Sequence, residues 1–319
     1  MKLTNLCILF IILEVSIITA INTRINHLTG IYSKTVEYNK ALDSSVDDGT
    51  MDLVEVDSKR NIVLNKEKAV DQFFNSLYAN FGVMDNGILQ RRLREYIPII
   101  LITDENGFYI YYMDQYVEQG EVVLGDRWSE KYPYIYEDNG FIYKFTLGDM
   151  VTLYNKDTQE FITGNYKELG TIYTESITAK KDIFDSIRRT AIIHAIEVKM
   201  NYYINKYNHM ASQFGITYQF WLPIIDRADW YRTIDDISMF VIFQNYPYNA
   251  GSLDTYNRYA FGGARITKSH LYYIKNVNSI KYYHKENCRY LTVNGQENWY
   301  YTKEECALEG AFPCPYCNP

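Results

Sequence analysis

The five cysteines of this 319-residue chain are very unevenly distributed, and their distribution constrains the fold more than any other feature. Cys7 lies in an apolar N-terminal segment, and the next cysteine in the sequence is Cys288. Disulfides therefore cannot stabilise the long body between them, which must bury an ordinary hydrophobic core. The C-terminal tail holds the other four cysteines and is too short to bury such a core alone, so we expect a cross-link or a metal there.

The spacing of His284, Cys288, Cys314 and Cys317 predicts a zinc site in this tail. Structural Zn²⁺ takes four nitrogen or sulfur ligands in a tetrahedron. Cys314 and Cys317 supply two thiolates from one tight turn, and another turn can bring His284 and Cys288 together. Two alternatives remain open at this point: Cys306 replaces His284 as the fourth ligand, or the clustered thiols form two disulfides.

The tail resembles the zinc module of the Ada DNA-repair family, and it is closer still to the short tails of some secreted nucleases. The matching residues are, in order, Tyr283, His284, Cys288, Leu291, Ala307, Gly310, Pro313, Cys314, Cys317 and Pro319. In Ada the first ligand is a cysteine that accepts a methyl group from DNA, whereas this chain has His284 there. The resemblance therefore implies the zinc-bound fold and contact with polyanions, but no methyl transfer.

Basic and aromatic residues alternate over residues 265–289, which include the start of this module. Lys281, Lys285 and Arg289 stand among tyrosines, a pattern that suits nucleic acid or another anionic polymer. The same pattern suits an exposed strand that keeps its edge charged. The net charge of −7 means that the chain as a whole does not attract nucleic acid, so any such contact would be local.

The N-terminal segment, residues 6–21, is apolar except for a few polar residues and Glu14. We expect a transmembrane or signal-anchor helix over residues 1–21, with a cleaved signal peptide as an alternative. This predicts a single-pass protein of the cell membrane with its head domain outside the cytoplasm. A carboxylate inside such a run is costly, so Glu14 predicts a function or a partner for that side chain.

Phe10 and Glu14 resemble the start of type IV pilins and pseudopilins, where a Phe is followed four residues later by a Glu. In that family the Glu meets the N-terminal amine of a neighbouring subunit and sets the register of the fibre. The resemblance implies an assembly role for Glu14. Leu9 departs from the family, because the prepilin peptidase needs a Gly at that position.

The remaining pattern predicts an α+β protein, since helices and strands mix without regular βαβ alternation. We expect a helical stalk and acidic loop over residues 22–57, an α+β head over 58–275 and the zinc module over 276–319. Apolar periodicity predicts helices at 66–81, 180–214 and 302–309. The expected strands are 60–65, 99–102, 107–116, 141–147, 150–154, 218–223, 237–244 and 256–266. Many of the 32 tyrosines suit half-buried strand positions.

The body contains polar residues for which we expect structural roles. His194 lies in an apolar helical pattern and is predicted to be a core residue, whereas His209 is predicted at the surface. Four aspartates with arginines between them predict turns and ion pairs; they are Asp226, Asp229, Asp235 and Asp236. Gly262 and Gly263 are expected to form a short turn.

The sequence carries no recognisable catalytic motif, which favours a non-enzymatic protein. Together with the N-terminal resemblance, this predicts a surface-displayed, pilus-like or secretion-apparatus subunit with a structural zinc module. The alternative is an anchored or secreted binding protein whose C-terminal tail contacts nucleic acid or another polyanion.

Overall fold

A computed structural model describes residues 3–56, 62–118, 120–213, 217, 219–249, 253–264, 272–277, 279–285, 288–290, 299–300 and 303–317. It divides into two compact units, residues 1–264 and residues 265–319. The first unit is a mixed α+β structure, and the described residues of the second form a small sheet with one short helix.

The helices of the first unit are α1 (Leu3–Met51), α2 (Lys66–Asn80), α3 (Gly87–Arg94), α4 (Tyr166–Ile172), the 3₁₀ helix η1 (Ile177–Ala179), α5 (Lys181–Gln213) and α6 (Arg227–Ile234). Its strands are β1 (Val54–Val56), β2 (Ile62–Leu64), β3 (Ile99–Asp104), β4 (Gly107–Glu118), β5 (Glu121–Trp128), β6 (Tyr134–Asp138), β7 (Phe141–Phe145), β8 (Met150–Asn155), β9 (Glu160–Asn165), β10 (Ser238–Pro247) and β11 (Thr255–Gly263). Strands β1 and β2 form a separate antiparallel pair.

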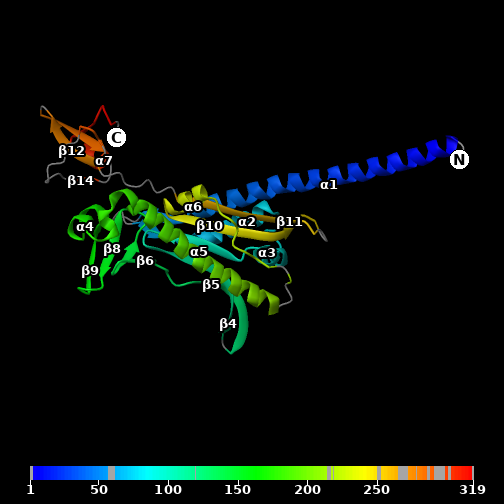
Figure 1. The fold of residues 1–319 in the computed structure, drawn as a ribbon, viewed down its shortest axis with the longest axis horizontal. Coiled ribbons are helices and arrows are strands. Elements are labelled where there is room, and N and C mark those ends of the chain that lie inside the picture. Colours follow the sequence, from blue (N-terminus) through cyan, green and yellow to red (C-terminus); the bar gives the residue numbers. More distant parts are fainter. Residues whose placement is uncertain are drawn as a thin grey trace. The chain divides into compact units, whose positions relative to one another are not determined.

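A five-stranded antiparallel sheet in the order β11-β10-β3-β4-β5 forms the centre of this unit (Figure 1). Successive residues of a strand point to opposite faces of a sheet. Tyr111 of β4 meets Phe74 of α2, with ring centroids 6.4 Å apart, whereas Tyr112 meets Tyr203 of α5 at 4.3 Å. Helices thus cover both faces, which explains why β3 and β10 are continuous apolar runs and not alternating ones.

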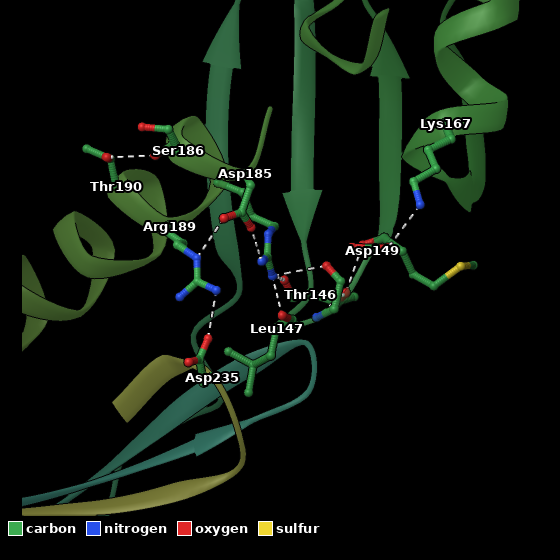
Figure 2. Close-up of polar contacts among 12 residues, drawn as sticks. Thr146, Leu147, Asp149, Lys167, Asp185, Ser186, Arg189, Thr190 and Asp235 are labelled. Carbon is green, nitrogen blue, oxygen red and sulfur yellow. Dashed lines mark hydrogen bonds and ion pairs between the residues drawn. The ribbon is translucent and has the colours of Figure 1, made fainter. Parts of the chain in front are cut away.

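A second antiparallel sheet, β6-β7-β8-β9, packs against the first part of α5. The ring of Phe184 lies 4.0 Å from that of Tyr166 of α4 and 5.8 Å from that of Phe145 of β7. The next turn of α5 adds polar contacts: Arg189 bonds Asp185 at 2.8 Å and Asp235, which follows α6, at 2.7 Å (Figure 2). Helix α5 therefore joins both sheets into one unit.

Several tyrosines serve these sheets as core residues. Tyr134, Tyr143 and Tyr256 lie on strands and are fully buried. Tyr38 of α1 packs among aromatic rings that include those of Tyr246 and Tyr256, at 5.3 and 5.4 Å. Burial there raises the pKa of Tyr38 to about 12.

The structure overturns the prediction of a transmembrane segment. Among the described residues, no helix combines the length and the apolar character needed to cross a membrane. The apolar run of α1 contains Glu14 and ends at Ile21, after which Asn22, Thr23 and Arg24 follow. The predicted transmembrane helix, single-pass topology and location at the cell membrane are therefore wrong.

The predicted acidic loop is wrong as far as Met51, because α1 continues helically through that stretch. Leu42, Ser45 and Val46 are buried there, and Ser76 of α2 donates a hydrogen bond to Asp48. Tertiary packing thus stabilises a helix that the polar sequence does not predict.

Three other local predictions also fail. Residues 219–223 form no strand. The side-chain amide of Asn208 instead donates to the carbonyl of Phe220 and accepts from its N–H group, both at 2.8 Å. Gly262 and Gly263 belong to β11 and not to a turn. His194 is exposed on α5, so it is not a core residue; His209 is exposed as expected.

The strongest local patterns are confirmed. Helix α2 runs from Lys66 to Asn80 with the predicted apolar face buried, and Gly82 follows it with φ +66°. Strands β3 and β4 pair from Ile99↔Tyr112 to Asp104↔Gly107, so the predicted hairpin turn is present. The predicted long helix is α5.

Gly49 of α1 lies against α2. A Cβ atom there would stand 2.9 Å from the carbonyl oxygen of Ala69 and 3.0 Å from Cβ of Phe73. We expect Gly49→Ala to lower the free energy of unfolding by about 1–3 kcal/mol, measured by urea denaturation. Gly30→Ala is the matched control, because no atom lies within 4 Å there and Ala favours a helix by about 0.5–1 kcal/mol. Equal effects of the two substitutions would contradict the packing of α1 on α2.

The second unit contains β12 (Tyr272–Val277), β13 (Ile280–Lys285), β14 (Trp299–Tyr300), α7 (Lys303–Leu308) and β15 (Phe312–Pro313). Its sheet has the order β14-β12-β13-β15, and the β13–β15 pair is parallel. Tyr272, Tyr283, Cys306 and Ala311 form a small buried cluster. A core this small cannot stabilise a unit of this size by itself.

Candidate metal centre

Strands β13 and β15 bring the two halves of the predicted site together. Tyr283 lies opposite Pro313 in the parallel pair, so the residues that follow, His284 and Cys314, come out side by side. The backbone N–H of Cys314 donates a hydrogen bond to the carbonyl of Tyr283 at 3.0 Å, which fixes this register. Cys288 follows the end of β13, and Cys317 lies in the turn after Cys314.

The ligand atoms of His284, Cys288, Cys314 and Cys317 all lie within 4.8 Å of one another. His284 Nδ1 and Cys288 Sγ are 3.2 Å apart. The first three residues are buried and Cys317 is half-buried. Ligand atoms around a tetrahedral zinc with bonds of ~2.3 Å lie roughly 3.7 Å apart, so this group can hold a metal ion after small movements.

The environment of Cys314 favours the thiolate that a metal requires. Burial raises the pKa of this thiol, but hydrogen bonds from the backbone N–H groups of Cys317 and Tyr316, together with contacts to the Cys317 and Cys288 side chains, outweigh it. The net effect lowers the pKa of Cys314 below its usual value. Metal binding needs deprotonated sulfur, so this residue is prepared for ligation.

The structure decides between the ligand sets that the spacing left open. Cys306 is fully buried in the separate cluster with Tyr272, Tyr283 and Ala311, and it does not belong to the metal-binding group. Among the described residues no disulfide joins any cysteine pair. Other described His, Cys, Asp and Glu side chains form no further group of three or more at metal-binding distance.

The predicted polyanion-binding residues do not form a common site in the described part of the chain. Lys281 bonds the backbone oxygen of Glu309 at 2.9 Å and its carboxylate at 3.5 Å, so its charge is already compensated. Arg289 is exposed. The side chain of Lys285 lies outside the described residues.

The predicted assembly residue, Glu14, is exposed on α1, in unit 1 and not in this centre. The predicted aspartates of unit 1 form caps and ion pairs: Asp226 caps α6 through the N–H of Ala228 at 2.8 Å, and Asp235 pairs with Arg189. Asp229 lies 3.8 Å from Arg232.

Sequence reasoning missed two aromatic features of the centre. Tyr273 of β12 is buried against Cys288 and Cys314, and it pairs with His284 in the register of β12 and β13. Tyr290 and Tyr316 have rings 4.1 Å apart and remain largely exposed. The position of Tyr316 between two ligands was the one signal that the sequence offered for the second pair.

Comparisons of this chain with models of known families, with curated protein sequences and with solved structures find no match.

Proposed function

We propose that the metal is zinc and that its role is structural. Three thiolates and one imidazole are soft and borderline ligands, a set that is typical of Zn²⁺ and unsuited to Mg²⁺ or Ca²⁺. All four positions of a tetrahedron would be filled by side chains, which leaves no position for a reacting water. Zinc in this site would supply the folding free energy that the small core of the second unit lacks.

The function that we propose for the whole chain is non-enzymatic assembly through α1, with the zinc-folded unit as an attached module. One observation carries this proposal. Residues 10–25 of α1, which we call the outer segment, are all exposed although the segment is rich in large apolar side chains. It extends away from the rest of unit 1 (Figure 1).

From Phe10 to Ile21 the outer segment carries apolar side chains on every side. Phe10, Ile11, Ile12 and Leu13 are consecutive, and their exposed fractions run from 54% to 68%. A helix that is apolar all round is normally buried, and a helix without tertiary contacts is only marginally stable in water. Association with the same segment of other copies would bury the apolar side chains and would give the helix the tertiary contacts that stabilise it.

Glu14 gives this association its specificity in our proposal. Glu14 lies among Leu13, Val15 and Ile17, and in an interface on that face its carboxylate is tolerated only opposite a polar or basic partner. One buried polar residue in a helical interface fixes register and the number of subunits. The resemblance to the first turns of pilins supports the same role.

We expect Glu14→Ala to alter or abolish the native oligomer of the full chain, because the wrong register is no longer penalised. Analytical ultracentrifugation of wild-type and variant chains at equal concentrations measures this. Glu37→Ala is the matched control, since Glu37 is also an exposed carboxylate of α1 but lies outside the apolar run. Ile18→Asp should abolish association through α1. A monomeric wild type, or an oligomer indifferent to both Glu14→Ala and Ile18→Asp, would remove the proposal.

Polyanion binding by the second unit is the second candidate. It is favoured by the exposed pair Tyr290 and Tyr316, since aromatic platforms stack bases, and by exposed Arg289 beside them in the sequence. The pairing of Lys281 with Glu309 reduces the free positive charge of this surface. Assembly through α1 is the better supported function.

A further inference from the structure

Strand β5 forms one edge of the five-stranded sheet. It pairs with β4 on one side, and in the part of the chain that the structure describes no strand pairs with its other side. The β4–β5 register runs from Tyr111↔Trp128 to Glu118↔Glu121 without a shift, and β5 contains no proline. An edge strand without a bulge or a proline presents a row of backbone donors and acceptors that another strand can pair with.

The outer end of the β4–β5 hairpin is also apolar. It extends past the helices that cover the inner part of the sheet (Figure 1). Val117, Val122 and Leu124 point to one face of it, with exposed fractions of 69%, 62% and 44%. Exposed β-branched and aliphatic residues on an open edge favour the addition of a strand.

The charges of β5 indicate which strand fits. Two copies of β5 can pair antiparallel about a two-fold axis at Leu124, so that Leu124 faces Leu124 of the partner subunit. In that register Glu121 faces Arg127 of the partner subunit, and the same pair occurs twice. Glu121 and Arg127 are both exposed and point to the same face, and the described residues supply no ion pair to either. The contact of Arg127 with the Tyr116 ring, 4.4 Å from its centroid, holds the guanidinium over that face.

We infer that β5 is a self-association edge, through which two copies of this chain join their five-stranded sheets into one continuous sheet. The contact is separate from the outer segment of α1. Both backbone pairing and side-chain charge are self-complementary, so the interface closes as a dimer.

Disulfide trapping tests the register. In a Cys7→Ser background, Leu124→Cys should form an intermolecular disulfide under mild oxidation, because directly opposed Cβ atoms lie ~5 Å apart. Val122→Cys is the matched control on the same exposed face. Its counterpart lies four positions along the strand in this register, roughly 13 Å away, so it should not cross-link. Equal cross-linking of the two variants, or none from Leu124→Cys, would overturn the inference.

Charge reversal tests the pairing of Glu121 with Arg127. Glu121→Arg and Arg127→Glu should each weaken the dimer about tenfold, since each places like charges opposite one another twice. The double variant should restore wild-type affinity. These affinities are measured by sedimentation in the Ile18→Asp background, in which association through α1 is removed. The test of the β5 edge is therefore independent of the test of assembly through α1. Single reversals without effect, or a double variant no better than either single one, would contradict the register.

Discussion

Chelation of the metal should unfold the C-terminal unit while residues 1–264 keep their fold. The metal-binding group and a four-residue hydrophobic cluster are the main sources of order described in that unit. Apparent binding free energies of structural zinc in small domains are about 10–16 kcal/mol, well above the stability that so small a core supplies. Loss of amide hydrogen-exchange protection confined to residues 265–319 would show the effect directly.

Single substitutions separate the ligands from the neighbouring thiol. Elemental analysis should find one zinc per chain in the wild type and in Cys306→Ala, and none in Cys314→Ser. Cys306 is the matched control because it is buried in the same unit but outside the metal-binding group. If Cys306→Ala lost the zinc and His284→Ala retained it, Cys306 and not His284 would be the fourth ligand. A wild type without zinc would contradict the centre itself.

Arg188→Ala should lower the free energy of unfolding of unit 1 by roughly 2–4 kcal/mol. The guanidinium is 5% exposed and donates to the carbonyls of Thr146, Leu147 and Gly148, and it also pairs with Asp185. Removing it leaves buried carbonyl groups without their donors and detaches α5 from the loop between β7 and β8.

The neighbouring residue provides the control for that substitution. Arg189 bonds Asp185 and Asp235 (Figure 2), but its side chain is more exposed than that of Arg188, so Arg189→Ala should cost only about 1 kcal/mol. Urea denaturation of both variants gives the comparison. Equal losses of stability would mean that ion pairing, and not the buried carbonyl contacts, stabilises this part of α5.

Local chemistry explains which parts of the fold were predictable. Helix α2 has its apolar stripe and a following glycine within one short stretch, and the β3–β4 hairpin has its turn residues between two apolar strands. The acidic end of α1 was not predictable in this way. This part of the helix is held by contacts such as that of Arg258 with Asp43, whose partners lie far apart in the sequence.

The metal centre shows the same division. The four ligands were predictable because two pairs, each close in sequence, carry the chemistry. The place of Cys306 was not, because it follows from packing against Tyr272 and Tyr283. The compensation of Lys281 by Glu309 was equally hidden, since the two residues are distant in sequence.

The position of β10 has a consequence for the order in which the protein is made. β10 lies between β11 and β3 in the sheet. Helix α1 packs on β10 and β11. α1 precedes β10 and β11 in the chain, so the part of its surface that these strands cover stays open until they are made. During that interval its apolar side chains are open to other nascent chains, and such long-range closure is slow and prone to misassembly. Under the role that we propose for α1, early pairing with a neighbouring copy would shorten this exposure.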